Sequence, residues 1–103
     1  MRKLTNQLEG YRLSRLADND LIDIITYTKQ KFGSNQTKKY LLEINSVVES
    51  LINNPYLGKR RLDILPDIYT FPVGAHLIFY KLDDKQLLIV RILHESRDYQ
   101  KYF

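Results

Sequence analysis

Two stretches with helical spacing of apolar residues, joined by a single glycine, most constrain how this chain can fold. Apolar residues recur on one helical face through residues 17–32 and again through residues 40–51. Gly33 stands between the two stretches and is suited to end the first helix. Ser14 and Ser34 are suited to cap the two helices. So short a joint predicts that the helices run antiparallel as a hairpin.

The second half of the chain predicts strands. Pro55 should end the second helix near Asn53, because proline disfavours helix at the residue before it. After an irregular stretch come three short segments rich in β-branched and aromatic residues. They are 68–73, 76–82 and 87–93. Their short links make them antiparallel, and the alternation that opens residues 11–17 predicts a short first strand. The predicted fold is therefore α+β, with an N-terminal strand and a two-helix hairpin packed on a small antiparallel sheet.

Length and composition indicate one domain. A chain of 103 residues suits a single domain, which we place at residues 11–103 after a polar leader at residues 1–10. The leader starts with basic residues but has no apolar segment of the kind found in secretory signals. No apolar run approaches the roughly 18 residues of a membrane span. We therefore expect a cytoplasmic protein without membrane contact.

Composition also narrows the chemistry. There is no cysteine, and two histidines eighteen residues apart do not form a zinc site. The four glycines are isolated, so no phosphate-binding loop is present. The formal charge of +4 is divided evenly between the two halves, without a basic tail. We expect no metal, no cofactor and no direct sequence-specific binding of nucleic acid.

Metal-free RNA cleavage is the chemistry that the remaining residue types would permit. It needs a base, an acid and cations around the scissile phosphate. His76, His94, Arg91, Arg97 and the basic run at 59–61 supply suitable side chains. The simpler interpretation is that His76 bonds to backbone at a strand start and that the basic run is solvated.

Arg91 interrupts the otherwise apolar segment "LLIVRIL", so it needs a partner or an open face. In a regular strand Arg91 would share a face with Leu93, and His94 would point to the other. The two could act together only if the strand ends or bulges before His94. This geometry counts against a simple Arg–His catalytic pair.

Four lysines surround the interhelical turn, and the sequence predicts that they are solvated surface. They are Lys29, Lys31, Lys38 and Lys39.

An ordered series of motifs carries a family resemblance over positions 11–103. The series is "YRLSRLADNDLIDI", "YTKQKFG", "LINNPYLGKRR", "FPVGAHLIFY" and "VRILHESRD". With these motifs the chain resembles the ParE group of the RelE/ParE toxins from bacterial toxin–antitoxin pairs. The resemblance implies the fold predicted above and a ParD-like antitoxin as partner. It also implies poisoning of DNA gyrase, which makes the protein an inhibitor of another enzyme and leaves it without catalytic residues of its own.

On this interpretation the basic residues of the strands and loops contact the target. The predicted target-binding residues are Arg60, Arg61, Arg91, His94 and Arg97. Two alternatives remain open. One is a RelE-like, ribosome-dependent mRNA endoribonuclease, in which Arg91, His94, Arg97 and Tyr99 would be catalytic. The other is a non-toxic binding module of the same fold.

The antitoxin is expected to lie in a groove between the helical hairpin and the sheet. The strands are apolar on both faces, whereas a hairpin covers only one face, and an exposed apolar remainder marks an interaction site. A helix in the groove or a strand added to the sheet edge would both fit. The predicted antitoxin-binding residues are Ile24, Tyr27, Tyr40, Ile44, Phe71, Ile78 and Tyr80.

Overall fold

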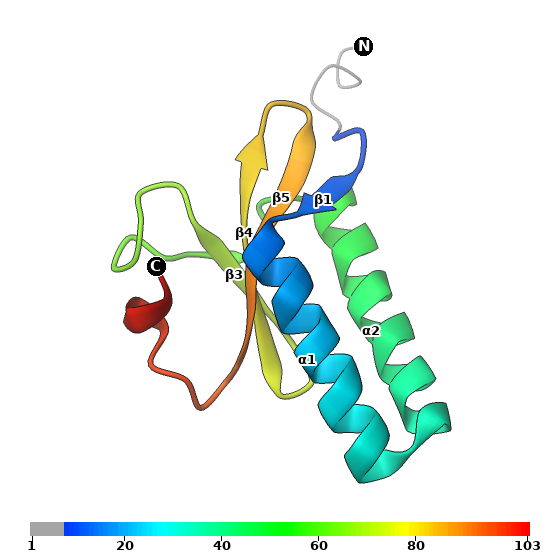
Figure 1. Ribbon diagram of the computed structural model, residues 1–103. Coiled ribbons are helices and arrows are strands. Elements are labelled where there is room, and N and C mark those ends of the chain that lie inside the picture. The colour runs from blue at the N-terminus through cyan, green and yellow to red at the C-terminus, as the bar shows by residue number, and fades with distance from the viewer. Residues whose placement is uncertain (1–7) are drawn as a thin grey trace.

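Two antiparallel helices lie against one face of a five-stranded sheet in the computed structural model, which describes residues 8–103 (Figure 1). The elements, in chain order, are β1 (Tyr11–Leu13), α1 (Arg15–Phe32), α2 (Ser34–Asn53), β2 (Lys59–Arg60), β3 (Tyr69–Val73), β4 (His76–Asp83), β5 (Gln86–His94) and the 3₁₀ helix η2 (Tyr99–Tyr102). The α+β prediction is confirmed. Within residues 8–103, neither helix is apolar enough along its length to cross a membrane.

The helical hairpin forms where the sequence predicts it. The Ser14 side chain caps α1 by accepting a hydrogen bond from the backbone N–H of Ala17. Gly33 ends α1 with φ of 88°, a conformation that favours glycine. The prediction that Ser34 caps α2 is wrong. Gly33 itself is the N-cap, Ser34 is already helical, and no side chain caps this end. Phe32, placed on the apolar face by its spacing, is instead 61% exposed.

The sheet is mixed, with strand order β1-β5-β4-β3-β2. The three predicted antiparallel strands are confirmed as β3, β4 and β5. Two features differ from the small antiparallel sheet that was expected. β1 pairs in parallel with β5, because α1 and α2 carry the chain across before it returns. The stretch predicted to be irregular contributes a two-residue edge strand, β2, which pairs with β3.

The ends of the chain also contact the sheet. Residues 1–7 of the predicted leader lie outside the described residues. Leu8 packs against the main core, and the backbone N–H of Leu87 donates to the carbonyl of Gly10, so the contacts of the domain begin before residue 11.

The main core lies between the helices and the sheet. Tyr80 of β4 is fully buried there, and burial raises the pKa of its hydroxyl to about 12. The protonated hydroxyl donates to the carbonyl of Pro55 at 2.8 Å and accepts from the N–H of Gly58 at 3.0 Å. Tyr80 thereby holds the loop that follows α2 against the sheet.

A second, smaller core covers the opposite face of the sheet, and the sequence did not predict it. Ile68, Phe79 and Leu93 are buried there. The tail, residues 95–103, folds over them, with the rings of Tyr99 and Phe103 centred 5.2 and 5.1 Å from that of Phe79. The C-terminal residues are therefore part of the fold, and the face they occupy is called here the tail-covered face.

Gly58→Ala should lower the free energy of unfolding by about 1–3 kcal/mol, the usual range for an overpacked site. A Cβ at this position would collide with the Tyr80 hydroxyl and would lie 2.8 Å from the carbonyl oxygen of Thr70. Urea unfolding followed by circular dichroism measures the change. Gln30→Ala, on the exposed side of α1, is the control and should change stability by less than about 0.5 kcal/mol. Equal midpoints for the two variants would refute the close packing of Tyr80 on this loop.

Candidate functional site

A β-bulge interrupts β5 immediately before Arg91, and the side chains of Arg91 and His94 line one pocket. Phe79 pairs with Arg91 whereas Tyr80 pairs with Ile89, so Val90 is the extra residue. The bulge shifts the alternation of side chains by one position. Two pairs of side chains confirm this shift. Ile89 and Ile92, three positions apart, both join the main core. Val90 and Leu93, also three positions apart, both join the smaller core on the tail-covered face.

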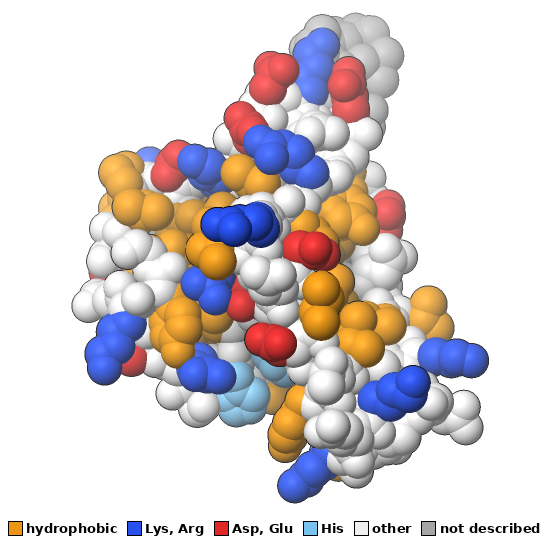
Figure 2. All heavy atoms as spheres, in the orientation of Figure 1, with side chains coloured by type: hydrophobic (Ala, Val, Ile, Leu, Met, Phe, Trp, Pro, Cys, Tyr) orange, Lys and Arg blue, Asp and Glu red, His pale blue; other side chains and the backbone are white. Residues whose placement is uncertain are grey.

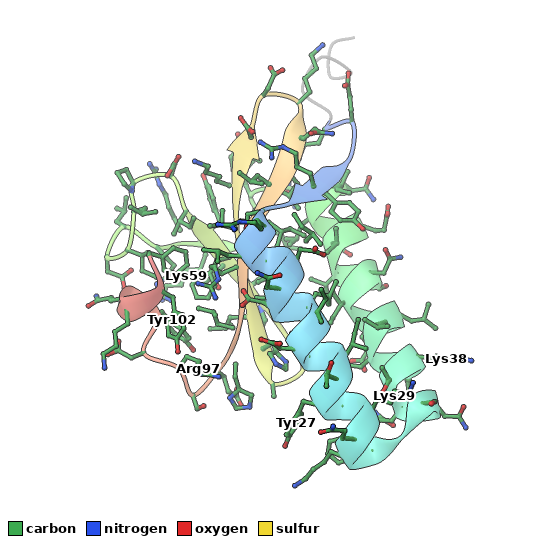
Figure 3. All side chains as sticks on the ribbon, viewed as in Figure 1. Tyr27, Lys29, Lys38, Lys59, Arg97 and Tyr102 are labelled. Carbon is green, nitrogen blue, oxygen red and sulfur yellow. The ribbon has the colours of Figure 1, made fainter. Side chains whose placement is uncertain are left out.

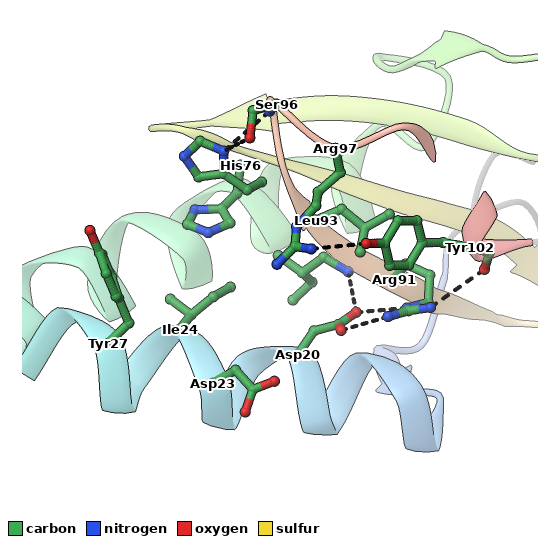
Figure 4. A pocket seen from close by; sticks show the side chains of 12 residues that line it. Asp20, Asp23, Ile24, Tyr27, His76, Arg91, Leu93, Ser96, Arg97 and Tyr102 are labelled. Atoms are coloured by element: carbon green, nitrogen blue, oxygen red, sulfur yellow. Dashed lines mark hydrogen bonds and ion pairs between the residues drawn. The ribbon is translucent and has the colours of Figure 1, made fainter. Parts of the chain in front are cut away.

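Arg91 finds its partner in α1. Its Nε and Nη2 atoms both donate to the carboxylate of Asp20 at 2.8 Å, and both side chains are only 12% exposed (Figure 4). This bidentate geometry is the strongest form of an arginine–carboxylate contact. The Asp20 carboxylate also raises the pKa of Arg91. Arg91 is therefore a charged link between the two layers rather than a free cation.

The exposed edge of β5 beyond β1 is closed by side chains. β1 pairs only with Leu87, Leu88 and Ile89. Past that point, the hydroxyl of Ser14 donates to the carbonyl of Val90, and the N–H of Ile92 donates to the carboxylate of Asp20. These backbone groups would otherwise pair with an added strand.

The two histidines lie against each other on the helix side of the sheet. Their rings are 5.4 Å apart and nearly perpendicular. The Tyr40 hydroxyl of α2 donates to the carbonyl of Val73 at 2.8 Å and lies 2.7 Å from Nδ1 of His76. The Tyr40 hydroxyl thus joins Nδ1 of His76 to the end of β3. Burial, and then the nearby His94, lower the pKa of His76.

Basic side chains surround the tail. The Arg97 guanidinium donates to the hydroxyl of Tyr102 at 2.9 Å and has no carboxylate partner among residues 8–103. Arg61 lies 5.6 Å from the ring of Tyr99 and is paired with Asp63, whose pKa it lowers to about 2. These contacts hold aromatic rings against planar cations.

Between α1, the end of β5 and the tail lies a pocket of about 680 Å³ (Figure 4). Its lining includes the carboxylates of Asp20 and Asp23, the ring of Tyr27, both histidines and the arginines Arg91 and Arg97. Apolar side chains of α1 and β5 form its floor. No group of three or more His, Asp or Glu side chains in the described part of the chain could hold a metal ion. The pocket thus presents both acidic and basic side chains beside apolar ones.

The predicted antitoxin-binding residues separate into three groups. Ile44, Ile78 and Tyr80 are buried in the main core and are not available to a partner in this conformation, because spacing alone does not distinguish a core face from a contact face. Ile24 and Tyr27 line the pocket; Ile24 is 7% exposed and also belongs to the main core, whereas Tyr27 is 59% exposed.

The other two predicted residues lie outside the pocket. Tyr40 is partly buried and bonds to the turn between β3 and β4, while Phe71 of β3 is partly buried against the main core. Only part of the predicted surface is therefore brought together.

Of the four residues of the alternative ribonuclease site, Arg91, His94 and Arg97 line the pocket, whereas Tyr99 lies apart from them. His94 lies on the helix side against His76, and its Nδ1 accepts from the N–H of Ser96. Tyr99 lies on the tail-covered face against Phe79, and its hydroxyl donates to the carbonyl of Glu95. Arg97 reaches the pocket and Arg91 is neutralised by Asp20. The structure thus separates the proposed base from the tyrosine.

Asp20 of the pocket was missed by the sequence analysis. It is one of three aspartates near the start of α1, and its partner lies 71 positions away. Tyr102, which with Tyr99 gives the tail its aromatic residues, has Arg91 and Arg97 at 5.3 and 5.8 Å from its ring. An unpaired arginine in an apolar strand was the one available signal, and it indicated a partner without identifying it.

Comparison with known proteins gives a consistent result. The model of the family "ParE toxin of type II toxin-antitoxin system, parDE" matches residues 11–99. Toxin ParE1 of Caulobacter vibrioides is 33% identical over 89 residues, which cover 86% of this chain and 92% of that toxin. Toxin ParE1 of Mycobacterium tuberculosis is 29% identical over 89 residues, covering 85% of this chain and 91% of the toxin.

Two solved structures share the fold. One is described as the chromosomal ParDE TA system from P. aeruginosa, with a TM-score of 0.73 at 20% identity, covering 86% of this chain and 97% of that chain. The other is the YoeB dimer from Staphylococcus aureus, with a TM-score of 0.59 at 21% identity, covering 85% and 97%. At these identities the likeness shows the fold alone.

Asp20→Asn should lower the free energy of unfolding by about 3 kcal/mol, because it leaves the mostly buried Arg91 without its counter-charge. Asp23→Asn, one turn further along α1 and exposed in the same pocket, is the matched control. It should change stability by less than about 0.5 kcal/mol. Chemical denaturation at neutral pH compares the two, and similar losses in both variants would contradict a specific role for the ion pair.

Proposed function

The chain belongs to the ParE toxins of type II toxin–antitoxin systems, and from this membership we propose that it poisons DNA gyrase in the cytoplasm and is neutralised by a ParD-like antitoxin. The observation that carries the proposal is the family match over residues 11–99. A gyrase poison must hold another enzyme in a DNA-bound state, which is a task of binding rather than of acid–base chemistry.

The arrangement of the polar groups supports binding over catalysis. An acid–base mechanism needs at least one titrating group within reach of a shared reacting atom. Here His94 and Tyr99 lie on opposite faces of the sheet. Burial disfavours the charged form of His76, and its Nδ1 atom is engaged by the hydroxyl of Tyr40. These observations favour the inhibitor over the ribonuclease.

Among the predicted target-binding residues, Arg97 and Arg60 are the strongest candidates. Both are exposed, Arg97 bonds only to a tyrosine hydroxyl, and Arg60 only to the carbonyl of Pro66. An arginine without a carboxylate partner can donate two hydrogen bonds from its planar guanidinium group to a carboxylate or phosphate of the target. Arg91 is engaged by Asp20, so we assign it a structural role. Arg61 is partly engaged by Asp63.

The pocket beside α1 is the proposed antitoxin site. The chromosomal ParDE system that shares this fold is, by its description, such a toxin–antitoxin assembly. Ser14 and Asp20 occupy the backbone groups of the β5 edge, which argues against an added strand there. We therefore propose a helical antitoxin segment whose apolar side chains cover Ile24 and Tyr27.

Purified toxin should inhibit supercoiling by gyrase and cause linear plasmid to accumulate. Arg97→Ala should weaken inhibition roughly tenfold, the effect of about 1.4 kcal/mol from one charge-assisted contact. His94→Gln should retain inhibition, because glutamine keeps hydrogen-bonding capacity without titrating. Gel assays of supercoiling and of DNA cleavage measure both effects.

Arg12→Ala is the control for Arg97→Ala, since Arg12 is also exposed but pairs with Asp83 at the distant end of the sheet. Circular dichroism checks the folding of each variant. The proposal fails if purified toxin leaves gyrase untouched at micromolar concentration, cuts mRNA in ribosomes, and loses this cleavage in His94→Gln.

Tyr27→Ala should weaken antitoxin binding by roughly 1–2 kcal/mol, the scale of an aromatic side chain at the centre of an interface. Tyr11→Ala is the matched control, because Tyr11 is likewise exposed but lies on β1, outside the pocket. Calorimetric titration with the antitoxin encoded beside the toxin measures both affinities. Equal affinities, together with no added hydrogen-exchange protection of α1 and β5 in the complex, would exclude the pocket as the antitoxin site.

A further inference from the structure

The free end of the helical hairpin concentrates positive charge. This hairpin tip, residues 29–39, contains Lys29, Lys31, Lys38 and Lys39. No acidic residue occurs between Ile24 and Leu42. The four lysines equal the formal net charge of the whole protein, so the rest of the chain has as many basic as acidic residues. The net charge is divided evenly between the two halves of the chain, so a comparison of the halves does not reveal this local excess of lysine.

The lysines of the tip are exposed and without carboxylate partners. Residues 29–36 are all exposed, as are Lys38 and Lys39. None of the four takes part in the salt bridges found among residues 8–103. On the face drawn in Figure 2, Lys and Arg side chains appear at this end of the hairpin without acidic ones. Figure 3 shows Lys29 and Lys38 pointing outward from the two helices.

Helix stability explains only half of these lysines. Lys29 and Lys31 lie in the last turn of α1, where positive charge is favourable to the helix macrodipole. Lys38 and Lys39 lie near the start of α2, where positive charge gains nothing from the macrodipole. The first turn of α2 also has no acidic residue and no side-chain cap. Two adjacent lysines there call for a reason outside the helix.

The other side chains of the tip suit a nucleic acid better than a lipid surface. Within residues 29–39, Phe32 is the one exposed large apolar side chain that the structure shows. A membrane-bound helix would present a continuous apolar face. Instead the tip carries the amides of Gln30, Asn35 and Gln36. Lysines combined with amide donors are the usual ligands of phosphate and sugar oxygens.

We propose that the hairpin tip binds the phosphate backbone of duplex DNA. The choice of DNA among polyanions rests on the proposed function, since gyrase holds a DNA duplex while it is poisoned. Figure 1 shows the tip projecting beyond the sheet, away from the tail. The tip can therefore reach DNA while Arg97 and the pocket contact protein. Lysine contacts to phosphate carry no sequence information, which agrees with a chain that has no DNA-reading motif.

Fluorescence anisotropy with purified toxin and a fluorescein-labelled duplex of about 20 base pairs, with gyrase absent, tests the binding step. The expected dissociation constant is on the order of 10⁻⁶–10⁻⁴ M, as for non-specific binding. The logarithm of the association constant should fall against the logarithm of KCl concentration with a slope of about −2 to −4, which corresponds to two to four phosphate contacts.

The double variant Lys38→Gln/Lys39→Gln should bind the duplex at least roughly fivefold more weakly and reduce the salt slope by about 2. Lys81→Gln/Lys85→Gln removes the same charge from a half-buried and an exposed position elsewhere and should leave binding unchanged. Equal losses in the two double variants would overturn the proposal, because the effect would then come from net charge. Tighter binding to single-stranded RNA, or binding only to phosphatidylglycerol vesicles, would also overturn it.

The same variants in the supercoiling assay separate this inference from the gyrase proposal. Toxin that binds duplex through Lys38 and Lys39 but leaves gyrase untouched contradicts the gyrase proposal and supports the DNA contact. Wild-type toxin that poisons gyrase, with Lys38→Gln/Lys39→Gln equally potent, contradicts the role of the tip and leaves the gyrase proposal standing. Reduced potency in that variant alone supports both.

Discussion

The ion pair between Asp20 and Arg91 is the contact on which most of this structure depends. It places a charge in an otherwise apolar strand and supplies the counter-charge from the first helix, so the two layers are held in one position relative to each other. The same carboxylate accepts the N–H of Ile92, and the same guanidinium faces the ring of Tyr102. Such a pair adds little net stability over an apolar contact, but losing one partner leaves a buried charge. Its value here is that it joins helix, strand edge and tail at a single point.

The β-bulge at Val90 lies immediately before the arginine of that ion pair. One extra residue lets β5 contribute Ile89 and Ile92 to the helix side while Val90 and Leu93 serve the other face. Both faces of the sheet are therefore covered, one by helices and one by the tail. The proposed antitoxin site is consequently the pocket between α1 and β5, and not an open sheet face.

The pocket and the hairpin tip differ in how their charges are arranged. In the pocket, Arg91 is matched by Asp20 and Arg97 lies against the ring of Tyr102, which gives a surface of mixed sign. At the hairpin tip, by contrast, four lysines stand without acidic neighbours. The two proposals therefore rest on two separate surfaces. The proposed contact with DNA at the tip would depend on long-range attraction, and the proposed antitoxin contact in the pocket on close complementarity.

The sequence by itself determined the local elements and the family. Helical spacing, the cap at Ser14, the stop at Gly33 and the effect of Pro55 depend on neighbouring residues, so the hairpin and four of the five strands could be predicted. The tertiary structure alone decided the parallel pairing of β1, the bulge at Val90 and the partner of Arg91. It also decided that Tyr80 is core while Tyr27 is surface. These features join residues far apart in the chain. Periodicity shows that a helix or strand has an apolar face, but it does not show what covers that face.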